Sequence, residues 1–453
     1  MTTPSNAQGH VESRLHELRK RRLQMIDGNL TSNARSAEGG ASVRVLEGGY
    51  WGFASAPATD AASRAALVER AARNARTLAR FGARPARTLP GGTYRGEQRH
   101  AGQPTPSEKD CIDRLAELQA WCRTRYPTLK SMRFLLQEED HDKRVTTSAG
   151  SDVRSTIRRA TLHTTFVATD DRGMPAELTE SLSGKGSLGD LDWSLAAMQP
   201  RLDAQHEHLQ AKRHAVAARG GAHTVVLAPE LAGMLAHEAM GHPCEADLVL
   251  GGAVTGGLLG QRVASDLVTM VDLARTYAGA EVMVPVYADD EGTPAEDVVL
   301  IRDGLLTGFM SSRETAAQLG IAASGSARAY APDDEPLVRM RNTAILPGRD
   351  RLDAMIAGVD DGYFLMRTSN GQADSTTEFM FGISLGYQIR NGKLGRAIRD
   401  TTLSGSAIKV LQTVDAVSDD MAWTCSGYCG KKQPMIVSMG GPALRARAHL
   451  GGE

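Results

Sequence analysis

Short apolar runs separated by glycine-containing turns are the main pattern along the chain, and they predict many strands joined by tight hairpins. Asp27-Gly28, between Met25-Ile26 and Asn29-Leu30, is typical of a type I′ turn. In the second half, Asp303-Gly304 and Asn391-Gly392 each separate two apolar runs in the same way. The second half is therefore expected to be dominated by strands.

Helical spacing of apolar residues is found mainly in the first half. Residues 60–81 predict a helix with four apolar side chains near one face, namely Leu67, Ala71, Leu78 and Phe81. Ser107, followed three residues later by Asp110, is a capping pattern that predicts the start of a second helix. Residues 83–106 contain several Pro and Gly and predict a loop between the two helices.

The length of the chain predicts two domains, because 453 residues are too many for a comfortable single hydrophobic core. Residues 197–218 are polar, show helical spacing and are followed by Gly220-Gly221, which predicts a helix connecting the domains. We therefore predict an α+β protein with an N-terminal mixed α/β domain over residues 1–218. Residues 219–453 are predicted to form a strand-dominated, barrel-like domain.

Composition and charge narrow the classes of function. Hydrophobic residues make up 41% and charged residues 23% of the chain, as in ordinary globular proteins, and the net charge is −1. Proteins that bind nucleic acid usually carry a basic excess, so we expect no nucleic-acid partner. Five cysteines cannot form a disulfide framework in so long a chain, and neither an apolar signal region nor a bilayer-spanning run is found. These features predict a cytoplasmic protein that does not contact membranes.

The segment from Val225 to His242 carries the candidate chemistry. An apolar strand leads into Pro229, which is favoured at the first position of a helix, and that helix would carry His237, Glu238 and His242. Two imidazoles with a carboxylate between them are the groups that a catalytic zinc needs, namely two ligands and a base for its water. Two unrelated histidines, one buried and one exposed, are the alternative interpretation.

The five-residue spacing of these histidines differs from the four-residue spacing of the common HExxH motif. Histidines five residues apart lie about 500° apart around an ideal α-helix, which leaves them roughly 140° out of phase. Both could reach one metal only if the helix contains a π-type turn or ends between them. Gly241, just before His242, permits such a distortion at little steric cost. We therefore predict a π-turn or a break near Gly241.

The wider sequence resembles the TldD/PmbA family of metalloproteases, in its TldD-type, metal-binding branch. HEAMGHPCEAD, preceded by VVLAPELAGML, is similar to the signature of that family. The resemblance covers most of the chain, because ASVRVLEGGYWGFAS near the start and VYADDEGTPAEDVVLIRDGLLTGFMSSRETAAQLG after the motif are also similar to family blocks. Ser324–Tyr330 is a weaker match. The resemblance implies that His237 and His242 are zinc ligands and that Glu238 is the catalytic residue.

The resemblance also implies a cysteine as the third metal ligand. SGYCGKKQ matches the place where the family supplies it, which assigns the role to Cys429. Flanking glycines would let the backbone approach a metal, and the Lys431-Lys432 pair would favour the thiolate. Cys425, four residues earlier, and Cys244, close to the second histidine, are the competing candidates. Pro243 and Cys244 also depart from the residues usual in the family at those positions.

The function that the resemblance implies is a zinc-dependent peptidase or amide hydrolase acting on unfolded or small peptides. It also implies a dimer that encloses a cavity, either a homodimer or a heterodimer with a PmbA/TldE-type subunit that lacks the metal motif. A biosynthetic amidase or dipeptidase acting on a peptide-like metabolite is one alternative. A non-catalytic partner or scaffold subunit is another, although such a subunit would not need Glu238 as a general base.

Other polar features are interpreted mainly as structural. Glu245 and Asp247 could orient His242 from behind, or could have purely structural roles. The acidic run Asp289–Glu291 is expected to form a solvated turn rather than a calcium site, because the EF-hand spacing is absent. Glycine-rich stretches lack a P-loop pattern, so no nucleotide cofactor is expected. Three histidines of the connecting helix are expected to face solvent: His206, His208 and His214.

Overall fold

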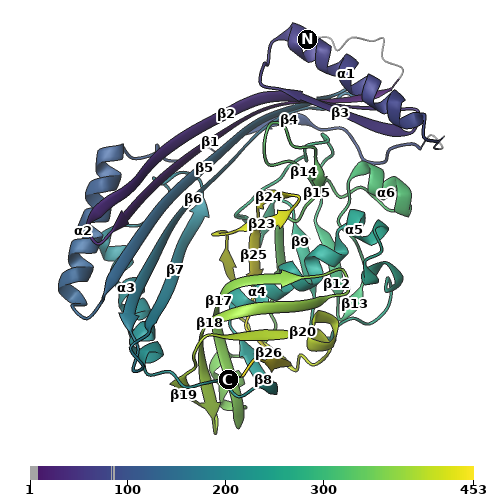
Figure 1. The fold of residues 1–453 in the computed structure, drawn as a ribbon. Helices are drawn as coiled ribbons and strands as arrows, with labels where there is room; N and C mark the ends of the chain where they lie inside the picture. The colour runs from purple at the N-terminus through teal and green to yellow at the C-terminus, as the bar shows by residue number, and fades with distance from the viewer. Residues whose placement is uncertain (1–8, 83, 85–86, 101, 453) are drawn as a thin grey trace.

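The computed structural model describes residues 9–82, 84, 87–100 and 102–452, so the first residues and parts of the predicted loop over 83–106 lie outside the described residues. Figure 1 shows a long, curved N-terminal sheet that arches over a more compact C-terminal half. This is the two-domain α+β architecture that the sequence predicts, while the boundary between residues 218 and 219 stays a prediction. None of the described helices is long and apolar enough to cross a membrane.

The N-terminal sheet is built from unusually long strands. Its order is β3-β2-β1-β5-β6-β4, with β7 also paired to β6. The turn between β1 and β2 has positive φ angles at Asp27 and Gly28, as the type I′ prediction requires. The strands are β1 (His10–Ile26), β2 (Asn29–Glu47), β3 (Tyr50–Ala56), β4 (Arg95–Gln98), β5 (Ser131–Thr147), β6 (Asp152–Thr169) and β7 (Pro175–Lys185).

Three helices cover the ends of this sheet (Figure 1): α1 (Ala61–Ala79), α2 (Glu108–Arg125) and α3 (Leu195–Arg213). The side chain of Ser107 accepts a hydrogen bond from the backbone N–H of Asp110, so the predicted start of α2 is confirmed. In α1, Leu67 and Ala71 are buried as predicted. The helix-covered core joins α2 and α3 to β1, β5, β6 and β7.

Two of the predictions for α1 and the following loop are wrong. α1 ends at Ala79, before the predicted end at residue 81, and the apolar side chains there are not covered: Leu78 is 42% exposed and Phe81 is 85% exposed. The segment expected to be only loop also contains β4, which pairs in parallel with β6. The sequence of β4, Arg-Gly-Glu-Gln, has no apolar alternation, so only the tertiary pairing reveals it.

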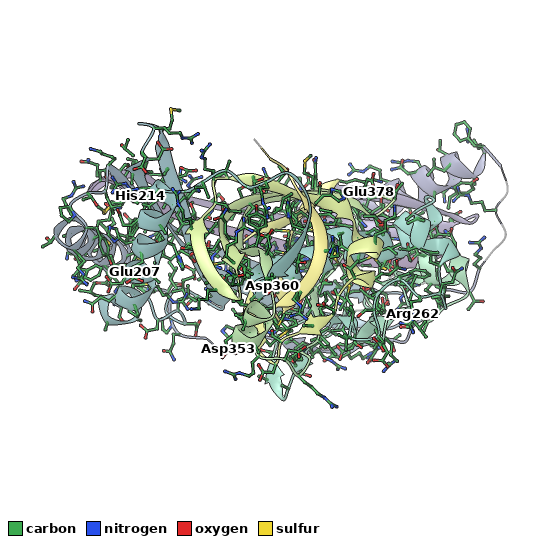
Figure 2. All side chains as sticks on the ribbon, turned by 90° about the horizontal axis from the view of Figure 1, so that it is seen from below. Glu207, His214, Arg262, Asp353, Asp360 and Glu378 are labelled. Carbon is green, nitrogen blue, oxygen red and sulfur yellow. The ribbon has the colours of Figure 1, made fainter. Side chains whose placement is uncertain are left out.

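The histidines of α3 are less exposed than expected. His206 stacks on Tyr126 with ring centroids 4.3 Å apart, and His208 Nδ1 lies 2.7 Å from the hydroxyl of Tyr387. Of the three, only His214, which follows the last residue of α3, is exposed; Figure 2 labels it together with Glu207 of that helix. The prediction that all three face solvent is therefore wrong for His206 and His208, whose rings pack against aromatic residues.

A closed ring of five strands forms the barrel-like part of the C-terminal half. The order is β17-β8-β26-β20-β18, and β18 pairs back to β17. Figure 2 views this part from below and labels Asp360 and Glu378, near the starts of β17 and β18. The ring strands are β8 (Gly221–Leu227), β17 (Asp361–Ala373), β18 (Glu378–Arg390), β20 (Thr401–Ser406) and β26 (Leu444–Leu450), with β19 (Lys393–Ala397) and β21 (Ala416–Val417) attached.

A second, six-stranded sheet lies beside the ring, in the order β13-β12-β9-β16-β25-β22. Its strands are β9 (Met270–Leu273), β12 (Val298–Arg302), β13 (Leu305–Leu306), β16 (Asn342–Ile345), β22 (Ala422–Thr424) and β25 (Ser438–Gly441). Three hairpins complete the strands: β10 (Thr276–Tyr277) with β11 (Ala280–Glu281), β14 (Ala327–Arg328) with β15 (Leu337–Val338), and β23 (Tyr428–Lys431) with β24 (Gln433–Ile436). The shorter helices are α4 (Pro229–Met234), α5 (Ala246–Leu250), α6 (Arg313–Leu319), α7 (Leu352–Ala357) and α8 (Ala407–Gln412).

Buried charges join the concave face of the N-terminal sheet to the C-terminal half. Lys143 Nζ donates to Asp290 Oδ2 at 2.7 Å, and Arg44 Nη1 donates to Glu291 Oε1 at 3.0 Å. The expectation of a solvated acidic turn over Asp289–Glu291 is therefore wrong, because all three residues are buried. Cations from the long strands compensate the acidic charges, which would otherwise be too costly to bury.

Candidate metal centre

The helix that carries the motif changes type before its second histidine. β8 leads to Pro229 at the start of α4, and the chain continues into a π-helix, η1 (Leu235–Gly241). The backbone N–H of His242 donates to the carbonyl of His237, which is the five-residue hydrogen bond of a π-turn. The predicted π-turn is therefore confirmed. Five residues make about one turn of such a helix, so the two histidines point the same way.

Tight packing explains why glycine is needed at the end of this helix. α4 and η1 lie between the strand ring and the six-stranded sheet, in contact with β17 on one side and β25 on the other. A Cβ atom at Gly241 would lie 2.3 Å from Sδ of Met340 and 3.0 Å from the carbonyl oxygen of Ala236. A larger residue would push the π-turn away from the sheet, and His242 with it.

Three possible metal ligands meet at this point. One ligand atom from each of His237, His242 and Cys429 lies within 4.8 Å of the other two. Sγ of Cys429 is 3.2 Å from Nε2 of His242, although 187 residues separate them in the chain. Two imidazoles and one thiol in this arrangement match the ligand number and the ligand types of a catalytic zinc site.

The state of His237 provides a direct test of whether a metal fits. Both of its ring nitrogens are buried, and neither has a hydrogen-bond partner among the described residues. Leaving such polar atoms unsatisfied in a protein interior is costly, and buried groups of this kind usually have a partner. A metal ion bound to one of the nitrogens would remove much of that cost, so the residues present fit a metal.

The competing cysteines lie elsewhere. Cys244 belongs to the main C-terminal core, and Cys425 packs in a small cluster with Val284 and Ile436. Neither joins the three-residue group of possible metal ligands found among the described residues. All five cysteines are free. The geometry favours Cys429, whose assignment as a ligand stays a proposal.

A buried carboxylate, that of Glu245, supports His242 from behind. Oε2 of Glu245 lies 2.7 Å from Nδ1 of His242, which leaves Nε2 of that ring directed toward Cys429. Lys431 Nζ lies 3.1 Å from Oε2 of Glu245 and 2.9 Å from Oδ2 of Asp247. The sequence predicts that Lys431 favours the thiolate of Cys429. In the structure its ammonium instead pairs with the carboxylates of Glu245 and Asp247. A carboxylate behind a ligating histidine fixes the ring orientation and raises its basicity.

The same arrangement favours an ionised thiol in the metal-free protein. Burial opposes ionisation, yet the neighbouring imidazoles of His237 and His242 lower the pKa of the Cys429 thiol from 9.0 to about 4. For Cys244, burial and the neighbouring charge of Glu245 act in the same direction and raise the pKa of the thiol to about 12. Burial also works against a charge on His242, but Glu245 and Cys429 outweigh it and raise the pKa of His242.

Titration of the metal-free protein should therefore reveal one thiolate at neutral pH. Because the pKa of Cys429 is lowered to about 4, its thiolate should persist at pH 7 and disappear only as the pH falls through about 4. Ultraviolet absorbance near 240 nm, followed against pH, measures thiolate. The Cys429→Ser variant should lack this step. A midpoint near the ordinary cysteine value would contradict the described environment.

The hairpin that carries Cys429 is anchored on the N-terminal sheet. Arg159 of β6 donates to the carbonyl oxygens of Cys425 and Gly427, and its guanidinium lies 4.3 Å from the ring centroid of Tyr428. The hydroxyl of Tyr428 donates to Oε2 of Glu139 on β5 at 2.5 Å. Residues from the first half of the chain therefore hold the segment just before Cys429.

We predict that Arg159→Met weakens metal binding by roughly 10–100-fold, the range typical for residues that support metal ligands. Without the guanidinium, the carbonyls of Cys425 and Gly427 lose their donor and the hairpin can shift. Competition with a chelator measures the affinity. The matched control is Arg158→Met, because Arg158 points to the other face and pairs with Glu138 and Asp140. Equal losses in both variants would contradict a specific role for Arg159.

Sequence reasoning did not find Arg159 or Glu139. No local motif surrounds them, and both lie in long strands of mixed polar residues. Their partnership with the Cys429 hairpin depends on how two distant parts of the chain pack together. Cross-strand pairing of Glu139 with Arg159 could be inferred once the register of β5 and β6 is known, but the chain pattern does not reveal that register.

Glu238 lies at the open side of the cluster. Its carboxylate oxygens are 3.9 Å from Nε2 of His237 and 3.7 Å from Nε2 of His242. The side chain is 20% exposed, whereas Glu245 is fully buried. Of the two carboxylates, Glu238 is therefore the one that water and a substrate could reach.

The strand ring, the arching sheet and the His–His–Cys cluster together define a two-domain α+β protein with a candidate metal site. A family model for the PmbA/TldA metallopeptidase C-terminal domain matches residues 220–450. A second model, for domain 1 of the PmbA/TldA metallopeptidases, matches residues 11–75. The chain belongs to the TldD/PmbA family.

Named relatives and a solved structure agree with this membership. A zinc metalloprotease TldD homolog of Saccharolobus solfataricus is 30% identical over 347 residues, which are 75% of each chain. A metalloprotease of Methanothermobacter thermautotrophicus is 39% identical over 236 residues, which are 51% of each chain. The crystal structure of TldE from Thermococcus kodakarensis is similar in fold, with a TM-score of 0.74, 15% identity and 96% of both chains covered.

Proposed function

We propose that the chain is a zinc-dependent peptidase or amide hydrolase. The convergence of two imidazoles, one thiol and a neighbouring carboxylate at the π-helix carries this proposal. His237, His242 and Cys429 would hold the zinc, and a fourth position would stay open for water, as is typical of catalytic zinc sites. The S. solfataricus relative, named as a zinc metalloprotease, supports zinc as the metal.

In the proposed reaction, zinc would supply the Lewis acid, Glu238 would transfer protons and Glu245 would orient His242. Zinc bound there would act as a Lewis acid toward the scissile carbonyl and would lower the pKa of a water molecule. Glu238, the accessible carboxylate, would take the proton of that water and pass it to the leaving amine. Glu245, buried behind His242, would keep that ring oriented without meeting the substrate.

The substrates and partners are also part of the proposal. We infer that the chain acts on unfolded or small peptides and works as a dimer, with a second copy or with a TldE-type subunit. Similarity in fold to TldE supports a partner of this kind. We further propose a cytoplasmic location and a domain boundary near residue 218.

Peptide cleavage by the purified protein tests this function. The zinc-loaded protein should cleave an unstructured peptide, lose this activity in a strong chelator and recover it when zinc is restored. Mass spectrometry of the products would locate the cleavage. Zinc bound in stoichiometric amount without any cleavage would instead favour a non-catalytic partner subunit. Cleavage that continues after complete removal of the metal would contradict the proposed mechanism.

A further inference from the structure

A small cavity of about 290 Å³ lies between the N-terminal sheet and the hairpin that carries Cys429. Strands β1, β2, β5 and β6 contribute one wall, and Tyr428 of β23 contributes the other. The cross-strand register places Lys20 beside both Ser36 and Glu139, and Glu139 beside Arg159, so these side chains share one face of the sheet. Figure 1 shows that this concave face is turned toward the C-terminal half.

The cavity is strongly basic in a protein whose net charge is −1. Five cationic residues line it, against two acidic ones. Several of these charges are already engaged: Arg159 and Glu139 hold the Cys429 hairpin. Arg21 and Arg35 reach toward the start of α2, where they donate to the carbonyl of Pro106 and to Glu108.

The cations left over are Lys20 and Arg22. No carboxylate of the described residues lies within ion-pair distance of Lys20, whose Nζ sits 4.8 Å from the ring centroid of Tyr330. The guanidinium of Arg22 makes one described side-chain contact, to the amide oxygen of Gln24. By contrast, Lys143 of the same face is paired with Asp290. Two neighbouring cations without acidic partners line this cavity, Lys20 half-buried and Arg22 exposed, and such a pair favours an anionic ligand.

The cavity and the candidate metal centre share one hairpin, because Tyr428 lines the cavity and Cys429 belongs to the metal cluster. Tyr428, which forms its wall, immediately precedes Cys429, and strand alternation directs their side chains to opposite faces of the hairpin. A ligand that follows the edge of this short hairpin could reach both sides. The volume lies just below the ~300–1,000 Å³ of pockets that enclose whole small molecules, so the cavity suits one end of a longer ligand.

We propose that this cavity binds a carboxylate of the peptide substrate, through the ammonium of Lys20 and the guanidinium of Arg22. The proposal rests on the proposed peptidase function and adds a preference to it. Either the C-terminal carboxylate of a peptide or an Asp or Glu side chain has the required chemistry. Lys20 and Arg22 are thus specificity-determining residues, whereas Arg159 supports the hairpin.

Binding of three labelled peptides to the zinc-loaded Glu238→Gln protein tests this, because that variant should bind without cleaving. One six-residue peptide has a free C-terminus and no acidic side chain, the second has an amidated C-terminus and a central Glu, and the third has an amidated C-terminus and a central Gln. Fluorescence anisotropy measures each affinity. We expect at least one carboxylate peptide to bind about 10-fold more tightly than the third, as one charge-assisted hydrogen bond would produce. The preferred peptide identifies the source of the carboxylate.

Variants link the preference to the cavity. Lys20→Gln should remove most of the 10-fold advantage and leave the affinity of the third peptide unchanged. Arg19→Gln is the matched control, because Arg19 lies on the other face of β1 and pairs with Glu17 and Asp140. Equal binding of all three peptides, or an equal loss for all three in Lys20→Gln, would overturn the proposal. A carboxylate preference that depends on Lys20 would stand even if the wild-type protein proved unable to cleave peptides.

Discussion

Replacing Glu238 with Gln is expected to lower peptide hydrolysis by at least ~100-fold while the metal stays bound, because only the proton acceptor is lost. Glu238 contacts the cluster at 3.7 and 3.9 Å but is not one of the three grouped ligands. The change from carboxylate to amide keeps the size of the side chain. Rates of peptide cleavage and metal content, measured on the same preparation, check the prediction.

Glu245, the buried carboxylate of the site, provides a matched control. Glu245→Gln is the same chemical change three residues past His242, but it removes the hydrogen-bond acceptor behind that ring. It should therefore weaken metal binding by ~10–100-fold and reduce activity only as far as metal is lost. Excess zinc should restore the activity of Glu245→Gln and not that of Glu238→Gln. Full activity of metal-loaded Glu238→Gln would remove this residue from the mechanism.

Replacing Cys429 with Ser is expected to lower zinc affinity and thermal stability together. The loss in affinity should be at least ~100-fold, beyond the range seen when only a supporting residue is removed. At a free zinc concentration 100 times the Kd of the native site, zinc binding adds about 2.7 kcal/mol to the free energy of unfolding. Most of that contribution should be absent in Cys429→Ser at the same zinc concentration. The ligands come from η1 and from a hairpin near the C-terminus, so metal binding depends on the fold being closed. Melting curves with and without chelator give the metal-dependent part of the stability.

Two other cysteines serve as controls for this result. Cys244→Ser and Cys425→Ser each bury a hydroxyl in the core, so each should lower the melting temperature. For each variant, the decrease should be the same with zinc as without zinc. Neither should change zinc affinity. If Cys425→Ser removes the metal while Cys429→Ser leaves it in place, the hairpin register described here is wrong. If neither variant loses zinc, the third ligand is a different residue.

The local chemistry of the site could be predicted from the sequence because it depends on short-range spacing. A five-residue gap between His237 and His242 is incompatible with one face of an α-helix, and Gly241 supplies the freedom to change the helix type. The position of Cys429 could be predicted only through the family resemblance. Spacing alone gives no reason why a residue 187 positions away should meet His242.

The contacts between the two halves of the protein could not be predicted. Asp289–Glu291 has the composition of a surface turn, yet Lys143 and Arg44 from the long strands bury it. The same is true of Arg159, which supports the Cys429 hairpin from β6. Such pairs depend on the register and curvature of strands far apart in the sequence, and charged residues show no periodicity that identifies their partners.

X-ray absorption at the zinc edge of the purified protein tests the central claim most directly. His237, His242 and Cys429 as ligands predict two nitrogen neighbours at about 2.0–2.1 Å and one sulfur neighbour at about 2.3 Å. The sulfur signal should vanish in Cys429→Ser and persist in Cys425→Ser. A spectrum of the native protein without any sulfur neighbour would contradict the assignment of the metal centre.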